Sequence, residues 1–321
     1  MDTSKKLYRL FGVTMASDFL FATPLPQVSG IPDVSFTCRS TKPVEGVKKL
    51  VYASESTTDD GKSWFSIHTM DDSHVFHYGK IVDFYITSDT IIAHLLDPAY
   101  YYMVEIMLLG EIFSLWLELQ GIPTIHASAA VVDNNAIAFL SSSKGGKSGL
   151  AAAFAQQGYQ ILTDDVLPVE DRHEHFMGRP GYPAMRMWPD QAGHFFGEYE
   201  NLEIVHPDFS KRRIPVGPEG IGTFCIEEKP LKAIYLPQRL DPDSDITIEP
   251  LSKKNALFAL IQNSFTAGLI ELLGLQPQRM NFFSRMVMQV PVRRLNYPEG
   301  FHHLSRVVDV VLEDIESLEK G

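Results

Sequence analysis

The feature that most constrains this sequence is a run of small residues between an apolar segment and an alanine-rich one. Residues 136–140 are apolar and predict a buried strand, residues 141–148 form the run, and residues 149–157 predict a helix. Gly158 ends the predicted helix, and residues 159–162 predict a second strand. The order strand, loop, helix, strand is typical of α/β proteins and predicts a parallel sheet.

The run of small residues is close to the phosphate-binding pattern G-x-x-x-x-G-K-[ST], with Ser141 at the place of the first glycine. Small residues let backbone N–H groups curve around phosphate oxygens, and the positive end of the following helix attracts the same anion. In this pattern Lys147 reaches the β- and γ-phosphates of a nucleotide, and the Ser148 hydroxyl binds Mg²⁺. A polar turn that only caps a helix is the alternative, but the flanking strands favour phosphate binding. The predicted nucleotide-binding residues are Ser143, Lys144, Gly145, Gly146, Lys147, Ser148 and Gly149.

Two adjacent carboxylates, Asp164 and Asp165, follow the second predicted strand. Ligands of open α/β sheets bind at the carboxyl ends of strands, so both acids are expected beside the terminal phosphate. One aspartate can hold Mg²⁺ while the other accepts a hydroxyl proton during phosphoryl transfer. Taken alone, the pair is more typical of an ordinary turn, but the loop upstream favours a functional role. His126, in the apolar run at residues 124–132, is by itself more typical of a core histidine than of a catalytic one.

Charge and hydropathy argue against several classes of function. The 321 residues carry a formal net charge of −12, which is unfavourable for broad binding of nucleic acid or anionic membranes. The most apolar stretch, residues 100–119, contains three glutamates, which are too costly for a lipid-spanning helix. The distant cysteines, Cys38 and Cys225, indicate neither a disulfide framework nor a zinc site. The amino terminus does not resemble a signal peptide, so we expect a cytoplasmic protein.

Two regions are predicted along the chain. Residues 1–98 contain short runs rich in β-branched and aromatic residues and predict a β-rich amino-terminal domain. Asp97 and Pro98 mark the boundary, and residues 99–321 are predicted to form an α/β phosphate-loop domain. Strands are expected at residues 8–14, 49–53, 64–68, 74–78, 82–87, 233–236 and 246–248. Helices are expected at residues 101–119, 255–275 and 301–318, and an irregular segment at residues 178–189.

Together these residues resemble the catalytic domain of the bacterial HPr kinase/phosphorylase family. That family has a histidine followed by a small residue, a β-hairpin, the phosphate loop, a helix that ends at a glycine, and a strand that ends in Asp-Asp. This chain is similar over roughly residues 121–170, from His126 through the loop and Gly158 to the two aspartates. The interval of 17 residues from Lys147 to Asp164 is also similar to the family's.

The resemblance implies a role for each matched residue. Asp165 becomes the proton acceptor, Asp164 assists at the metal, and His126 becomes an active-site residue. The implied cofactors are ATP and Mg²⁺. The family's downstream Glu-Ile-Arg-Gly segment has no clear copy here. Arg186 stands as the equivalent arginine without the glutamate, so neither phosphorylase activity nor HPr as the substrate is implied.

Three further segments, residues 181–190, 211–216 and 291–298, resemble a divergent branch of HPr-kinase-like proteins. Members of that branch occur in biosynthetic clusters for ribosomal peptides, including lasso peptides, and phosphorylate the precursor peptide, typically at a serine at its carboxyl end. The resemblance therefore implies a serine kinase whose partner is a precursor peptide. HPr kinases are hexamers, so a homo-oligomer is compatible with the resemblance, although nothing in this chain requires one.

Two other functions stay open at the level of the sequence. Ser141 and the missing glutamate favour a nucleotide-binding switch or adaptor without chemistry. A small-molecule kinase or an ATPase would use the same loop and acids. The basic residues at 211–213 and 293–294 are either solvated or bind phosphates or an acidic peptide end.

Overall fold

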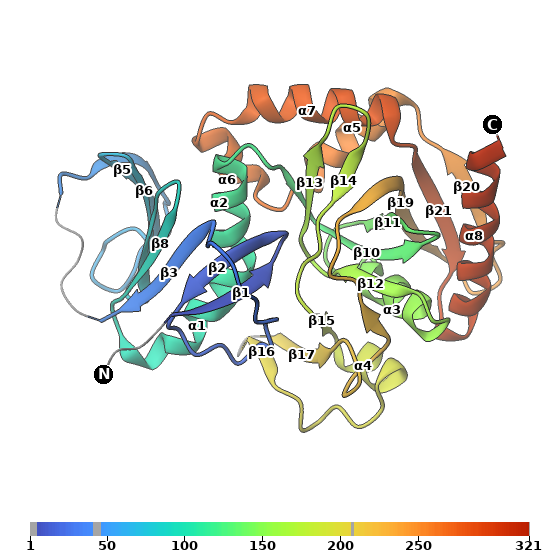
Figure 1. Cartoon of the computed structure of the whole chain (residues 1–321), viewed down its shortest axis with the longest axis horizontal. Coiled ribbons are helices and arrows are strands. Elements are labelled where there is room, and N and C mark those ends of the chain that lie inside the picture. The colour runs from blue at the N-terminus through green and yellow to red at the C-terminus, as the bar shows by residue number, and fades with distance from the viewer. Residues whose placement is uncertain (1–4, 41–45, 207–208, 321) are drawn as a thin grey trace.

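The computed structural model describes residues 5–40, 46–206 and 209–320. The chain is a mixed α/β structure with an eight-stranded sheet, a ten-stranded sheet and a small three-stranded sheet. In Figure 1 the eight-stranded sheet lies at one end of the long axis and the ten-stranded sheet, with its helices, at the other. In the described ranges, no helix is both long and apolar enough to cross a bilayer.

The eight-stranded sheet has the order β1-β2-β3-β8-β7-β6-β5-β4, and its buried side chains include Phe36, Phe76 and Phe84. The expected strand at residues 8–14 is two strands, because Phe11 and Gly12 both have positive φ and form a turn between them. Two strands of this sheet, β3 and β8, were not predicted. The strands are β1 (Lys6–Leu10), β2 (Val13–Ser17), β3 (Val34–Arg39), β4 (Lys49–Ala53), β5 (Phe65–Met70), β6 (Ser73–Tyr78), β7 (Val82–Ile86) and β8 (Thr90–Leu95).

A helical run joins the two large sheets, and the predicted helix at residues 101–119 is confirmed. It begins after a 3₁₀ turn (Pro98–Tyr100), where the side chain of Asp97 accepts a hydrogen bond from the backbone N–H of Ala99 at 2.9 Å. Its parts are α1 (Tyr101–Met107), a π-helical turn (Leu108–Ile112) and α2 (Phe113–Leu119). The run packs on the eight-stranded sheet in one shared core. The division into two domains at residue 98 stays a prediction.

The ten-stranded sheet is mixed, so the prediction of a parallel sheet is wrong. β10 lies between β11 and β12 and pairs antiparallel with both, while β11 pairs parallel with β19. Because β11 and β12 still run in the same direction, the loop after one and the acids after the other meet at one edge. The strands are β9 (Thr124–Ile125), β10 (Ala127–Val132), β11 (Asn135–Leu140), β12 (Gln160–Thr163), β13 (Leu167–Asp171), β14 (Phe176–Gly178), β18 (Thr223–Phe224), β19 (Lys229–Leu240), β20 (Thr247–Pro250) and β21 (Val292–Pro298).

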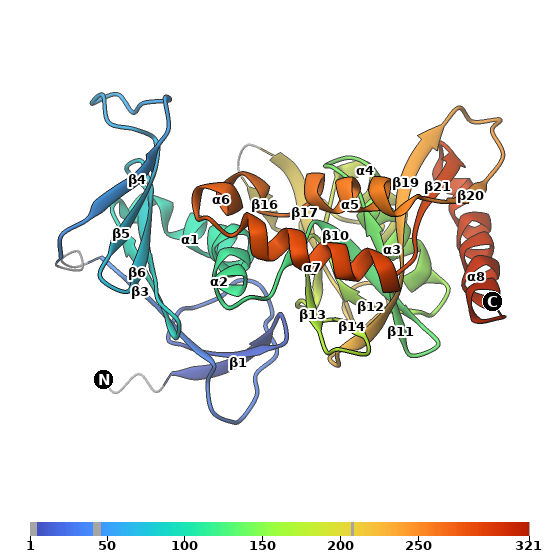
Figure 2. The same cartoon turned by 90° about the horizontal axis from the view of Figure 1, so that it is seen from above.

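Helices cover both faces of this sheet. Successive residues of a strand point to opposite sides, and both sides of β11 are apolar, so each side packs against helices. Ile137 and Phe139 of β11 share a core with α3 (Lys147–Gln156) and α8 (Leu304–Lys320). Ala138 and Leu140 share the other core with α5 (Lys253–Gln262) and α7 (Gln276–Gln289), which Figure 2 shows lying side by side. The amphipathic α8 confirms the helix expected at residues 301–318.

The helix expected at residues 255–275 is wrong, because the segment between α5 and α6 (Ala267–Leu272) is not helical. There the carbonyl of Asn263 accepts a hydrogen bond from the backbone N–H of His126 at 2.8 Å, and Ser264 forms a bridge with Ile125. A helix continuing through these residues would lose both contacts. The break between the two helices places Phe265 against the ring of His126.

The irregular segment expected at residues 178–189 is also wrong. It contains β15 (Ala184–Met187), which pairs with β17 (Phe209–Pro215) in the three-stranded sheet completed by β16 (Ile204–His206). The short helix α4 (Pro189–Phe195) follows β15. Glycine and proline are rare in strands, so their frequency in this segment argued against one. The strand forms because β15 pairs with β17, from Ala184 opposite Pro215 to Met187 opposite Arg212.

Candidate functional site

A tight loop joins β11 to α3. Lys144 and Gly146 have φ values of 66° and 99°, in the left-handed region that favours glycine. A Cβ at Gly145 would lie 2.3 Å from Ser141 Oγ, and one at Gly146 would lie 2.4 Å from the Tyr297 hydroxyl, so neither position has room for a side chain. Ser141 is not among the described residues with positive φ, so a serine fits there without backbone strain.

The helix α3 begins at Lys147, with Gly146 as its N-cap. Glycine offers no side-chain acceptor, so the N–H groups of the first turn are left for an anion, which the helix dipole also attracts. The ammonium group of Lys147 donates to the carbonyl oxygens of Ser141 at 2.9 Å and Ser142 at 3.4 Å. Burial lowers the pKa of Lys147, although the nearby aspartates oppose this effect. No carboxylate of the described residues forms an ion pair with this buried cation, so a phosphate would supply its counter-charge.

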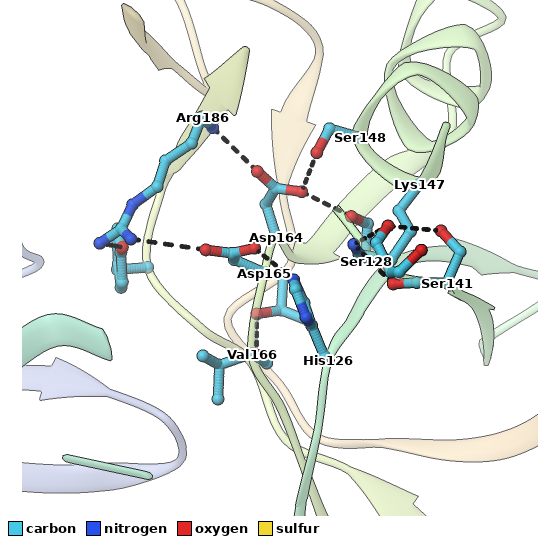
Figure 3. A network of polar contacts seen from close by, with 12 residues as sticks. His126, Ser128, Ser141, Lys147, Ser148, Asp164, Asp165, Val166 and Arg186 are labelled. Carbon is cyan, nitrogen blue, oxygen red and sulfur yellow. Dashed lines mark hydrogen bonds and ion pairs between the residues drawn. The ribbon is translucent and has the colours of Figure 1, made fainter. Parts of the chain in front are cut away.

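The carboxylate of Asp164 is held by donors from three separate elements (Figure 3). Its Oδ1 accepts hydrogen bonds from Ser128 Oγ at 2.5 Å and Ser148 Oγ at 2.8 Å, and its Oδ2 accepts the backbone N–H of Arg186 at 2.8 Å. Ser128 was not predicted as a site residue. Side chains alternate between the two faces of an extended segment, so Ser128, two residues after His126, faces the same side as His126. This spacing could have identified Ser128 from the sequence.

Asp165 has different partners from its neighbour. Its Oδ1 lies 2.9 Å from His126 Nε2, and its Oδ2 lies 3.4 Å from Arg186 Nη1. Burial alone would raise the pKa of Asp165, but the hydrogen bond to His126 and the charge of Arg186 outweigh it and hold this pKa well below its usual range. Asp165 is therefore ionised at neutral pH. Its φ of 74° is a strained conformation for aspartate, maintained by these contacts.

Arg186 connects the site to the amino-terminal half. Its Nη2 donates to the Tyr182 hydroxyl at 3.1 Å, and the Tyr182 ring packs edge-on against Phe11, with 5.7 Å between centroids. A Cβ at Gly110, in the π-helical turn, would lie 4.0 Å from Arg186 Nη1. Burial tends to lower the pKa of Arg186, but Tyr182 and the aspartates outweigh it and raise that pKa. The guanidinium is thus a permanent cation fixed from two sides.

These side chains surround a cavity of about 610 Å³, which we call the main cavity. Its wall includes the predicted catalytic residues His126, Asp165 and Arg186. It also includes every predicted nucleotide-binding residue from 143 to 148. Asp164 and Gly149 are buried just behind this wall. The structure therefore brings together side chains that the sequence separates by up to 60 residues.

Several wall residues were missed by reasoning from the sequence. The ammonium groups of Lys144 and Lys211 lie 4.9 and 5.4 Å from the centre of the Trp188 ring, within the range of cation–π attraction. Phe265 packs against the ring of His126 at 5.4 Å. Arg239, at the end of β19, also lines the wall, and no sequence motif indicated it. Lys211 alone had a signal, as the first residue of the basic run at 211–213.

The other two members of that basic run do not line the main cavity. Arg212 donates to the Leu202 carbonyl at 2.9 Å, and Arg213 forms ion pairs with Glu203 and Glu105. In the second basic run, Arg293 pairs with Asp314 at 2.9 Å. These arginines therefore have structural partners within the described chain.

The residues present fit a magnesium–nucleotide complex. The Ser148 hydroxyl and the Asp164 carboxylate are the hard oxygen ligands that Mg²⁺ prefers, and they already lie 2.8 Å apart. Mg²⁺ usually takes only one or two such protein ligands and fills its other positions with phosphate oxygens and water. The two glycines that a Cβ would obstruct leave the room a phosphate needs against the backbone.

Comparisons with known proteins give likenesses to solved structures alone. No family profile and no curated protein sequence matches this chain. Among solved structures, the HPr(Ser) kinase/phosphatase from Coxiella burnetii matches with a TM-score of 0.33 and 13% sequence identity, covering 62% of this chain and 99% of that chain. A likeness at this level leaves the function to be inferred from the site itself.

Proposed function

We propose that this chain is an ATP- and Mg²⁺-dependent kinase. The acceptor is a serine hydroxyl of a ribosomal precursor peptide, the C-terminal serine of a lasso-type precursor. The observation that carries the proposal is a single cavity in which a glycine-lined loop at a helix N-terminus adjoins an ionised aspartate at a strand end. Phosphoryl transfer needs these two parts together, one to hold the phosphates and one to orient the incoming hydroxyl.

The charge of the main cavity supports an anionic ligand. Five cationic side chains line it against two carboxylates, although the whole chain has a net charge of −12. Positive charge concentrated in an acidic chain attracts polyanions such as nucleotide phosphates. The cations are Lys144, Lys147, Lys211, Arg186 and Arg239, and the carboxylates are Asp165 and Asp190.

In this proposal the loop N–H groups and Lys147 bind the β- and γ-phosphates. Ser148 and Asp164 would hold Mg²⁺, which neutralises phosphate charge when bound. Ser128 keeps the Asp164 carboxylate oriented through its 2.5 Å hydrogen bond. The ring of Trp188 attracts the ammonium groups of Lys144 and Lys211 and so positions them at the wall.

Asp165 orients the acceptor hydroxyl and takes its proton while the bond from that oxygen to the γ-phosphorus forms. The bond from the γ-phosphorus to the bridging oxygen breaks, and ADP leaves with those electrons. His126 holds the Asp165 carboxylate, and Arg186 stabilises negative charge on the transferred group. The lowered pKa of Asp165 makes it a weak base, which suits phosphoryl transfer because positioning contributes more than proton abstraction.

The peptide acceptor is inferred from the segments that resemble kinases of ribosomal peptides. Residues 181–190 contribute Arg186 and Trp188 to the main cavity, and Lys211 comes from a second such segment. A peptide that ends in the phosphorylated serine brings a free carboxylate to the site. Lys211 supplies a cation for such a group.

Incubation of the purified chain with radiolabelled ATP, Mg²⁺ and a synthetic precursor peptide tests the proposal. We expect label on the terminal serine, lost when EDTA is added or when that serine is replaced by alanine. Label on free serine but not on the peptide would make the chain a small-molecule kinase. ATP binding without transfer to any acceptor would refute the kinase and leave a nucleotide-binding switch.

A further inference from the structure

A smaller cavity of about 110 Å³, which we call the side pocket, adjoins the main cavity. The two share the wall residues Gly146, Asp190, Gln191 and Arg239. The rest of the side pocket is formed by Gly149 and by side chains from residues 297–304, which connect β21 to α8. The two cavities therefore lie next to each other beside the loop, the main cavity on the side of Asp165 and the side pocket on the side of this carboxy-terminal segment.

The proposed transfer gives a bound nucleotide a direction along the loop. Its terminal phosphate must lie where Asp165 and Arg186 line the main cavity. The opposite end of the phosphate chain must then point away from these residues. Gly149 lies in the first turn of α3, and the wall of the side pocket contains it but neither Asp165 nor Arg186. The nucleoside end is thus directed toward the side pocket.

The side pocket also differs from the main cavity in chemistry. The carboxylates of Asp190 and Glu299 line it, and Arg239 stands at the junction between the two spaces. Carboxylates repel phosphates but accept hydrogen bonds from ribose hydroxyls and base amino groups. The wall also contains Phe301, whose ring stacks on His194 with 4.4 Å between centroids and 8° between planes. An aromatic ring fixed in this way is a platform suited to a planar base.

We propose that the side pocket binds the nucleoside of the nucleotide, with the base against Phe301 and the ribose hydroxyls donating to Glu299. This inference rests on the proposed function and adds the part of the ligand that the loop motif does not address. The two spaces differ in charge, and that difference orients the ligand. Lysines attract the phosphates to the main cavity, while the uncharged nucleoside occupies the side pocket beyond Arg239.

Calorimetry with two probes, Mg·ATP and Mg·tripolyphosphate, tests the inference, because tripolyphosphate has no nucleoside. We expect the wild-type chain to bind ATP about 10- to 100-fold more tightly than tripolyphosphate, the range expected for stacking of one base. Phe301→Leu, which keeps apolar volume but removes the ring, and Glu299→Gln are each expected to lower ATP affinity by about 10-fold. Both variants should bind tripolyphosphate like the wild type. Glu313→Gln, on the exposed side of α8, is the matched control for the loss of a carboxylate.

Each failure has a different meaning. Equal affinity of the wild type for both probes would overturn the side pocket as the nucleoside site. Equal losses for both probes in Phe301→Leu would do the same, since they would place the effect on the loop. If the wild type binds neither probe, the proposed kinase itself is wrong.

Discussion

Two pairs of a carboxylate and an arginine in this chain differ in their exposure and in the direction in which the pKa of the carboxyl is shifted. Asp165 and Arg186 line the main cavity, with side chains 19% and 16% exposed. Glu118 and Arg279 join α2 to α7, with side chains only 3% and 6% exposed. The pKa of Asp165 is lowered because His126 and Arg186 outweigh burial. Burial outweighs Arg279 and raises the pKa of Glu118 to about 7.

The difference lies in what surrounds each carboxylate. Asp165 has two cationic or polar side chains and an open cavity, so its charge is both stabilised and accessible to a ligand. Glu118 accepts from the backbone N–H of Thr124 at 2.6 Å and from its hydroxyl at 3.2 Å, but it has almost no solvent. Burying an ion pair costs desolvation, so the second pair holds elements in register at the expense of stability. The first pair is accessible to a ligand, whereas the second joins two helices of the fold.

Asp165→Asn should give the largest effect. Loss of the carboxylate that both positions the acceptor hydroxyl and takes its proton is expected to lower the rate of phosphoryl transfer by about 10²- to 10⁴-fold. The affinity for Mg·ATP should change little, because the loop is intact. Radiolabel transfer and calorimetry measure the two quantities. Glu118→Gln is the matched control and should keep its activity; a similar loss of rate in both variants would erase the distinction between the pairs.

Lys147→Ala should remove nucleotide binding. Truncating a buried charge that contacts phosphate is expected to weaken Mg·ATP binding by about 100-fold or more. Lys254→Ala, an exposed lysine at the start of α5, serves as the control and should bind like the wild type. Calorimetry on both variants gives the comparison. Unchanged binding by Lys147→Ala would show that the main cavity does not hold phosphates.

Arg186→Lys keeps the charge but loses the planar fork that reaches both Tyr182 and Asp165. We expect the transfer rate to fall by about 10- to 100-fold with a smaller change in nucleotide affinity. Arg279→Lys makes the same change at the buried pair and should instead lower the melting temperature while the folded fraction stays active. The comparison is contradicted if Arg186→Lys loses stability without losing rate.

Glu118 should make stability depend on pH, in the smallest of these effects. Folded chain keeps the Glu118 proton up to about pH 7, whereas the unfolded chain loses it near the ordinary glutamate pKa of about 4.3. The contribution of this carboxyl to stability is therefore full below the lower value and declines as pH rises to the higher one. Denaturant unfolding at pH 5 and pH 8 should show the wild type losing more stability than Glu118→Gln. Parallel losses in the two proteins would assign the pH dependence to other groups.

The sequence by itself determined the parts of the site that are local. The small residues at 141–148, the alanine-rich helix after them and the acids at 164 and 165 are close enough in the chain for spacing and backbone chemistry to fix their forms. Loop, helix and strand appear in the structure within two residues of their expected bounds. His126 was placed with them by resemblance, and it does lie 2.9 Å from Asp165.

Tertiary structure alone decided which distant segments complete the main cavity and how the strands are ordered. Trp188 is in place because β15 pairs with β17, Arg239 because β19 pairs with β11, and Phe265 because the chain leaves the helical conformation after α5. Arg186 was named by resemblance, but the same pairing of β15 brings it to Asp165. The pairing of β10 with β12 is likewise a choice of partner, whereas the hairpin of β10 and β11 was already implied by the resemblance. Periodicity and propensity report whether a segment is a strand and which face it buries. They carry no information on its partner, because hydrogen bonds between strands join backbone groups that all residues except proline share.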